Sequence, residues 1–141
     1  MKYPFFLFFI GLIFSCSDSD DITFAEESDF QGSWLLVGQY IDPGDGSGDF
    51  ENVDSGKTIQ FFADGSFTSK GSLCMMNTES DSESNGIYVV MEKLNEYSAE
   101  NYLTPENCDF EDFKIMLQFD GSNLLLSYQC FEGCVQKYAK R

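Results

Sequence analysis

The residues of this sequence with the clearest chemical potential are its cysteines. Cys130 and Cys134 are separated by Phe131, Glu132 and Gly133. A redox-active pair usually has two intervening residues and a basic neighbour that lowers the pKa of one thiol, and this pair has neither. If Gly133 takes the left-handed conformation in a hairpin loop, the two Cα atoms lie roughly 4.5 to 5.5 Å apart, which is within disulfide range. The pattern predicts a structural disulfide.

The other cysteines support a disulfide framework. After Cys16 the chain has four cysteines, namely the pair above with Cys74 and Cys108. An even number is typical of small exported domains, and four cysteines allow three connectivities. We favour Cys130–Cys134 together with Cys74–Cys108, and a link between Cys108 and Cys130 is an alternative.

Catalytic side chains are poorly represented. Histidine is absent, which removes the commonest general base and every Ser-His or Cys-His pair. Asp109 and Asp112 lie close in sequence, but no neighbour would tune the pKa of one of them. We therefore expect no enzymatic activity and no cofactor.

An acidic loop at residues 42–51 is the best candidate for a metal site. It offers oxygen ligands at alternating positions: Asp45, Ser47, Asp49 and Glu51. This spacing matches the first part of a calcium loop, which needs glycine at its sixth position and glutamate at its twelfth. Phe50 and Gly56 stand at those positions, so we predict a flexible rim loop and no metal.

The first 15 residues have the features of a targeting segment. Lys2 supplies a positive charge, and residues 5–14 form an apolar run that is too short to span a bilayer. Ile13-Phe14-Ser15-Cys16 resembles the lipobox of bacterial lipoproteins. The resemblance implies a signal peptide at 1–15 and acylation of Cys16, including palmitate. A secretory signal with an incidental cysteine is the alternative.

The segment that follows Cys16 is acidic and rich in serine. Residues 17–21 resemble the signals that send lipoproteins of Bacteroidetes-type bacteria to the outer face of the outer membrane. Each buried methylene of an acyl chain contributes about 0.8 kcal/mol, so a multiply acylated N-terminus anchors firmly. We expect a lipidated N-terminus and linker at 16–30, a domain at 31–141, and a lipid-anchored protein of the outer membrane that faces the cell surface.

The overall charge restricts the partners. The net charge is −16, and it becomes more negative when Lys2 leaves with the leader. Such a field disfavours nucleic acids and anionic lipid head groups and favours basic partners. We expect membrane contact through the N-terminal lipid alone.

Short runs with turn signals between them predict an all-β domain. In the clearest run, Phe113, Ile115, Leu117 and Phe119 share one face of a half-buried strand. Because sequential strands usually pair, we predict a small antiparallel up-and-down barrel of eight strands. The expected strands are 32–41, 58–62, 66–75, 86–92, 97–103, 112–119, 124–130 and 135–140.

Four segments, in order, resemble a known family. They are Gly32-Ser33-Trp34, the loop 42–48, the hairpin 64–67 and the segment 130–138. The set is similar to the lipocalin and calycin pattern, and more closely to the small lipocalin-like domains of Bacteroidetes lipoproteins. The resemblance implies a barrel whose open end binds a small hydrophobic molecule, with Trp34 at the barrel floor.

Aromatic and aliphatic side chains of the expected strands are candidates to line such a cavity. They are Tyr88, Tyr102, Phe113, Ile115, Leu117, Leu126 and Tyr128. The loops 42–56 and 77–85 would gate entry. Because eight strands enclose little more than their own side chains, the alternative is a filled barrel that acts as an interaction or inhibitor module for a basic protein partner.

Overall fold

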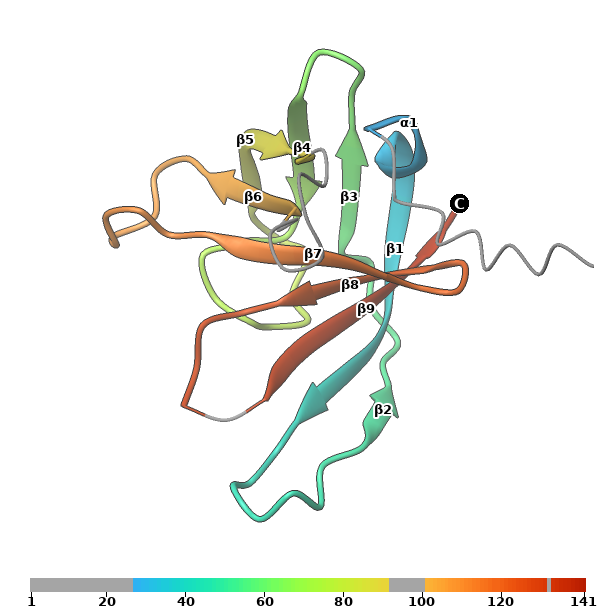
Figure 1. The fold of residues 1–141 in the computed structure, drawn as a ribbon, viewed down its shortest axis with the longest axis vertical. Coiled ribbons are helices and arrows are strands. Elements are labelled where there is room, and N and C mark those ends of the chain that lie inside the picture. The colour runs from blue at the N-terminus through green and yellow to red at the C-terminus, as the bar shows by residue number, and fades with distance from the viewer. Residues whose placement is uncertain (1–26, 92–100, 132) are drawn as a thin grey trace, which may run out of the picture.

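The computed structural model describes residues 27–91, 101–131 and 133–141, which form one antiparallel sheet closed into a barrel (Figure 1). The leader, Cys16 and part of the expected strand 97–103 lie outside these residues. The elements are α1 (Glu27–Phe30), β1 (Gly32–Ile41), β2 (Phe50–Asn52), β3 (Thr58–Phe61), β4 (Ser66–Lys70), β5 (Glu83–Val89), β6 (Asn101–Pro105), β7 (Ile115–Asp120), β8 (Asn123–Ser127) and β9 (Cys134–Lys140).

The described strands follow one another around the barrel in sequence order. From β3 to β9 each strand pairs with the next, and β1 closes the circle by pairing with both β3 and β9. The predicted all-β, up-and-down barrel of eight strands is confirmed. β2 is an extra strand within the segment 42–52, where the sequence predicted a loop, and it pairs with the far half of β1.

β1 organises the sheet because it is long enough to serve several partners. Its first half pairs with β3, its second half pairs with β2, and β9 follows its other edge with a bulge between Leu36 and Gly38. The β1–β2 hairpin extends beyond the barrel (Figure 1). Between β2 and β3 the chain stays attached to β1, because Leu36 N donates to Lys57 O at 3.0 Å.

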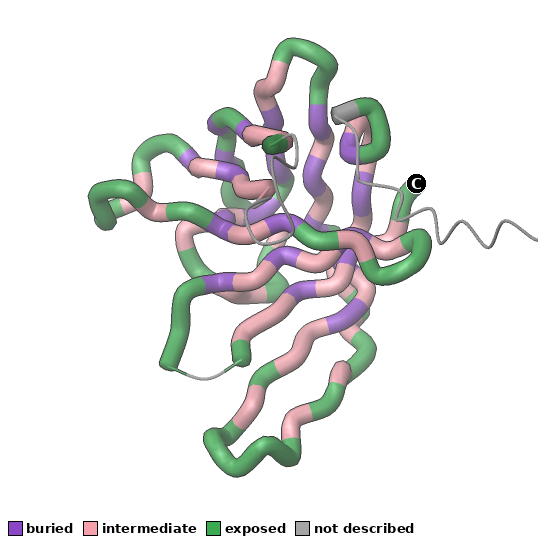
Figure 2. Tube along the Cα trace, viewed as in Figure 1, coloured by how far each residue is buried: buried purple, intermediate pink, exposed green. Residues whose placement is uncertain are grey.

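Burial alternates along the strands, as Figure 2 shows, so one face of each strand builds the core. At one end of the barrel, α1 places Phe30 over the interior, and the indole nitrogen of Trp34 donates to Phe30 O at 2.7 Å. The Phe30 ring lies 4.7 Å from that of Phe119. This end, which we call the α1 end, is closed by aromatic packing.

The structure differs from the predicted strands mainly at the opposite end, which we call the mouth. The strand predicted at 66–75 stops at Lys70, because Gly71 turns the chain with a φ of +102°. Residues 71–82 then form a loop, here named the mouth loop, and β5 begins earlier than predicted. β7 begins later than predicted, after Asp112 with its left-handed φ of 56°.

In the described ranges no helix has the length and apolar character to cross a membrane.

Candidate functional site

Polar side chains are buried inside the barrel near the mouth. Lys57 and Gln136 have no exposed surface, and Tyr138 is equally buried. Strand alternation explains their positions: Gln136 and Tyr138 are two residues apart on β9, and Lys57 precedes the buried Ile59 by two residues. An ordinary barrel core of this size would carry apolar side chains at these inward positions.

Gln136 is the centre of a hydrogen-bonded group. Its Oε1 accepts the hydroxyl protons of Tyr128 at 3.1 Å and Tyr138 at 3.0 Å. Its Nε2 donates to the backbone oxygen of Asn77 at 2.7 Å and to Oε1 of Gln39 at 3.4 Å. The buried amide is therefore held in one orientation by β9, β1, the mouth loop and Tyr128, which directly follows β8.

Lys57 contacts the same loop residue. Its Nζ lies 3.0 Å from the backbone oxygen of Asn77 and 3.3 Å from Asn77 Oδ1. Among the described residues, no carboxylate lies within ion-pair distance of this amine. Burial lowers the pKa of Lys57 from 10.5 to about 8, and it raises the pKa of Tyr128 and Tyr138. At neutral pH the barrel thus holds a cation whose hydrogen-bond partners among the described residues are neutral oxygens.

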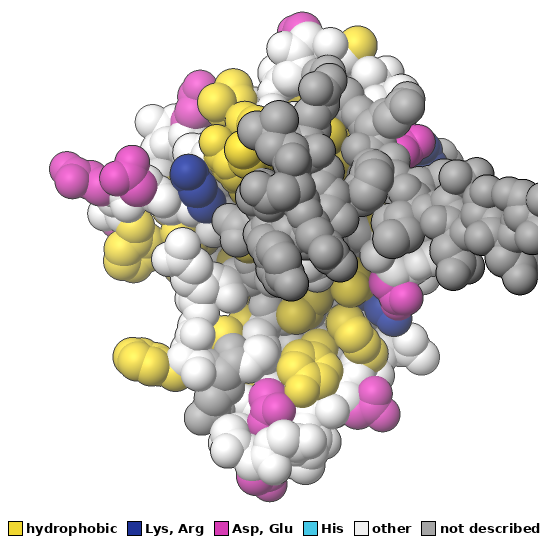
Figure 3. All heavy atoms as spheres, viewed as in Figure 1, with side chains coloured by type: hydrophobic (Ala, Val, Ile, Leu, Met, Phe, Trp, Pro, Cys, Tyr) yellow, Lys and Arg dark blue, Asp and Glu magenta, His cyan; other side chains and the backbone are white. Residues whose placement is uncertain are grey.

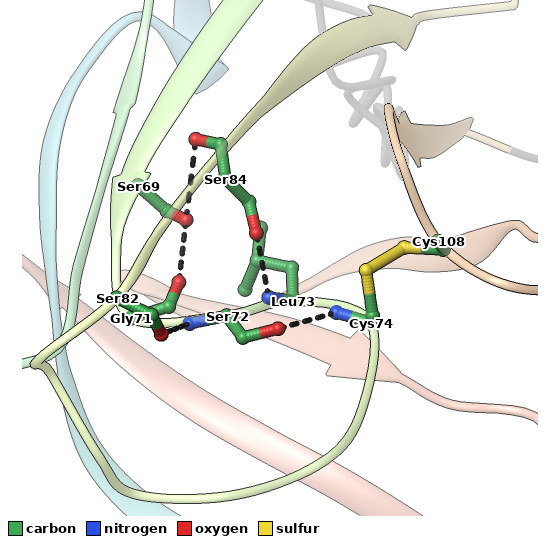
Figure 4. Close-up of a disulfide and its surroundings, with 8 residues drawn as sticks. All are labelled: Ser69, Gly71, Ser72, Leu73, Cys74, Ser82, Ser84 and Cys108. Atoms are coloured by element: carbon green, nitrogen blue, oxygen red, sulfur yellow. Dashed lines mark hydrogen bonds between the residues drawn. A yellow bond between two sulfur atoms is a disulfide. The ribbon is translucent and has the colours of Figure 1, made fainter.

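The mouth loop is attached to the barrel at several points. Leu73 is fully buried in the core, and the adjacent Cys74 is bonded to Cys108 in the β6–β7 connection. Figure 4 shows how serines fasten the start of the loop to the start of β5: Ser84 Oγ accepts from Leu73 N at 3.0 Å, and Ser82 Oγ accepts from Ser72 N at 2.9 Å. The loop 77–85, which the sequence predicted to gate entry, is therefore partly built into the wall through Ser82 and Ser84.

A hollow of about 450 Å³ lies beside this cluster, on the extended β1–β2 hairpin. It is lined by Gln39, Ile41, Pro43, Ser47, Gly48, Asp49, Glu51 and Val53. Gln39 joins the hollow to the buried group, since its Oε1 accepts from Gln136. A molecule bound in the hollow would therefore contact Gln39, which is hydrogen-bonded to Gln136 of the buried group.

The carboxylates of the acidic loop are used to shape it. Asp42 Oδ1 accepts from Gly44 N at 2.8 Å, and Asp45 Oδ1 accepts from Ser47 N at 2.9 Å. The bond from Gly44 N lowers the pKa of Asp42, and hydrogen bonds from the side chain and the backbone of Ser47 lower the pKa of Asp45. Within the ranges that the structure covers, no group of three His, Cys, Asp or Glu side chains is placed to hold a metal.

A second hollow, of about 730 Å³, lies on the outer surface. Residues of β3, β4 and β5 line it together with the end of the mouth loop, and all of them are polar or charged; most are on the outer face, whereas Ser69 and Ser84 are buried. Its lining resembles an ordinary solvated sheet face, and none of the lining residues belongs to the group around Gln136 and Lys57.

The predicted lining residues divide into three groups. Ile115, Leu117, Leu126 and Tyr128 are buried in the interior, and Leu126 lies opposite both Leu117 and Gln136 in the sheet register. Tyr88 is buried near the α1 end, and Phe113 is half-buried against the core. Tyr102 lies on the other face of β6 from buried Leu103, with Lys114 Nζ 4.2 Å from its ring centre, so it does not line the interior.

The disulfides follow the pairing favoured from the sequence. Cys74 is bonded to Cys108 with 5.3 Å between Cα atoms, and Cys130 is bonded to Cys134 with 6.2 Å. Asp109 and Asp112, the carboxylate pair considered for acid–base work, are both exposed in the β6–β7 connection and lie outside the buried group.

Sequence reasoning missed Lys57, Asn77 and Gln136 as site residues. For two of them the sequence holds a signal. Lys57 is in phase with the inward-facing Ile59 and Phe61, and Gln136 is in phase with the inward-facing Tyr138, so strand alternation places both polar side chains in the interior. Asn77 lies in a loop, and no local pattern indicates its contacts. In comparisons with protein-family models, curated proteins and solved structures, no match to this chain was found.

Proposed function

We propose that this protein is a lipid-anchored, lipocalin-like lipoprotein of the bacterial outer membrane, facing the cell surface, that binds a small apolar or amphipathic molecule in its barrel. The closed antiparallel barrel supports the proposal because it is compatible with the calycin architecture that the sequence resembles. The lipobox-like segment that ends at Cys16 supports the anchor.

The observation that carries the binding proposal is the polar cluster inside the barrel. Burying a lysine without a counter-charge lowers stability, so a barrel selected for packing alone would have an apolar residue at position 57. Leu117 and Leu126 form an apolar row directly beside Gln136. Ligand sites typically combine such apolar walls with a few well-placed polar groups.

The mechanism is passive burial. A molecule enters at the mouth, its apolar part leaves water, and its polar end is satisfied by Lys57, Gln136 and the tyrosine hydroxyls. We propose no catalytic step, since the acidic side chains considered for one lie on the exposed surface.

An apolar fluorescent probe, such as N-phenyl-1-naphthylamine, tests the proposal. The chain should enhance its emission, and Leu126→Trp should reduce the uptake by placing a larger side chain beside Gln136. Leu125→Trp is the matched control, because Leu125 lies on the opposite face of β8. Loss of uptake in both variants, or no uptake by the natural chain, would contradict binding in the barrel. Circular dichroism melts establish that both variants fold.

A second candidate, an interaction module for a basic protein, is favoured by the exposed apolar side chains near the mouth. Ile41, Met75, Phe110 and Phe131 are each more than half exposed, on β1, the mouth loop and two connections that end there. Figure 3 shows acidic side chains beside hydrophobic ones on the visible face. If this candidate is correct, a purified basic partner should bind with an affinity that falls steeply as salt is added, and the chain should not take up the probe.

A further inference from the structure

We propose that Asn77 is an internal substitute for a ligand, and that the carboxylate of a singly charged amphipathic molecule displaces it from Lys57 and Gln136. This inference rests on the proposed function and names the ligand class. It also gives the mouth loop a defined role, as the group that occupies the site until the ligand arrives.

Asn77 presents two acceptor oxygens to the site, as a carboxylate would. Its backbone oxygen and Oδ1 both accept from Lys57 Nζ, at 3.0 Å and 3.3 Å, and the backbone oxygen also accepts from Gln136 Nε2 at 2.7 Å. A carboxylate likewise presents two oxygens with about four acceptor positions. It can therefore take over all three hydrogen bonds without rearrangement of the barrel strands.

The charge at the site favours the exchange. Asn77 offers neutral oxygens to a buried cation, whereas a carboxylate would neutralise Lys57. The bonds from Lys57 to Asn77 are already strengthened by the charge of the amine, and a carboxylate would add the attraction between opposite charges. The ligand would thus remove a cost that the barrel carries in its free state.

The surroundings limit the ligand to one negative charge and an apolar tail. Asp49 and Glu51 line the hollow at the mouth, and they repel multiply charged anions. Ile41, Pro43 and Val53 line the same hollow and offer apolar contact as the molecule enters, before its tail is buried beside Leu117 and Leu126. Because the hollow is open to water, its charges are screened by salt, while the charge of Lys57 inside the barrel is not.

The part of the loop that must move is short. Serine hydrogen bonds and the Cys74–Cys108 disulfide hold the start of the loop, as described above. Its middle is held by the hydrogen bonds of Asn77, by Ser55 Oγ, which donates to Thr78 O at 2.6 Å, and by Met76, which packs against the core. A ligand therefore competes with a few hydrogen bonds and with the packing of one side chain.

Calorimetric titration with decanoate and decanol tests the inference, because the two share a ten-carbon chain and differ in the head group. At pH 7 we expect decanoate to bind at least about tenfold tighter, which corresponds to about 1.4 kcal/mol. Lys57→Met should remove this preference, because it weakens the binding of decanoate more than the binding of decanol. Lys114→Met is the matched control, because it removes an exposed lysine on the outer surface.

A pH series on the natural chain gives a second test that needs no variant to fold. The preference for decanoate should fall between pH 7 and about pH 9.5, as Lys57 loses its proton. If both compounds bind equally at pH 7, or if the preference persists in Lys57→Met, the carboxylate inference is wrong while binding in the barrel stands. If neither compound nor the fluorescent probe binds, the proposed function itself fails.

Discussion

Lys57 and Asn77 meet inside the barrel mouth, where Nζ of Lys57 lies 3.0 Å from the backbone oxygen of Asn77 and 3.3 Å from its Oδ1. The two residues are separated by 20 positions, which include β3, β4 and the start of the mouth loop. The contact joins a buried cation to two neutral oxygens. The proposed site depends on the positive charge of Lys57, which these two oxygens do not neutralise.

The first prediction concerns the pH dependence of stability. The pKa of Lys57 is about 8 in the folded chain and 10.5 when exposed. Between these values the unfolded state binds more protons, so the free energy of unfolding should rise with pH. We expect a rise on the order of 1 to 2 kcal/mol between about pH 7.5 and pH 9.5. Urea unfolding followed by the fluorescence of Trp34, the single tryptophan, measures it.

The control for this prediction is Lys57→Met, in which the rise should disappear. The upper limit of the pH range matters because Tyr128 and Tyr138 face the same cluster and have raised pKa values. Above about pH 10 they ionise more readily in the unfolded state, which lowers stability. Equal slopes in the natural chain and the variant would show that Lys57 is not a buried cation.

The second prediction compares the two disulfides. Cys74–Cys108 closes a long loop, with a sequence separation of 34, whereas Cys130–Cys134 has a separation of 4. On the chain-entropy model, replacing the first pair by serine should cost about 4 kcal/mol of unfolding free energy, and replacing the second about 2 kcal/mol. Denaturant unfolding of the two double variants checks this order. The reverse order would mean that the mouth loop is not anchored through Cys74.

The third prediction concerns the α1 end. Phe30 has no exposed surface and contacts the rings of Phe61, Tyr88 and Phe119. Phe30→Ala should therefore lower the free energy of unfolding by about 3 to 5 kcal/mol. Phe131→Ala is the control, since Phe131 is fully exposed, and it should change stability by less than about 0.5 kcal/mol. Comparable losses in the two variants would contradict closure by α1.

The fourth prediction tests the anchor. Cys16→Ser should leave the barrel unchanged and release the protein from the membrane fraction, because no acyl chain can be attached. Fractionation and mass spectrometry of the N-terminal peptide measure this outcome. An unmodified Cys16 in the natural protein would refute lipidation and favour an ordinary secretory signal.

The barrel itself could be predicted because its strands carry local signals. Phe113 to Phe119 alternates clearly, and glycine-containing turns separate the runs, so strand number and order follow from pairing rules. β2 was missed because it is short and lies among loop residues, where alternation has no length to develop. The mouth loop was predicted only in part, as a loop at 77–85, and its attachment to the barrel was missed because its serines resemble those of a solvated segment until β5 is present to bond them.

The candidate site could be predicted only in its apolar half. Leu117, Leu126 and Tyr128 follow strand alternation, and the structure buries them beside Gln136. The polar half depends on contacts across long sequence separations: Gln136 and Asn77 are 59 positions apart. No periodic pattern encodes such a contact, because it is created by closing the barrel and folding the loop over its mouth.

Native mass spectrometry of the protein released from its host membrane tests binding in the barrel most directly. The spectrum should contain a discrete small molecule bound in addition to the N-terminal lipid, and Leu126→Trp should lose it while Leu125→Trp keeps it. A spectrum in which the natural protein carries its lipid anchor and nothing else would contradict the account.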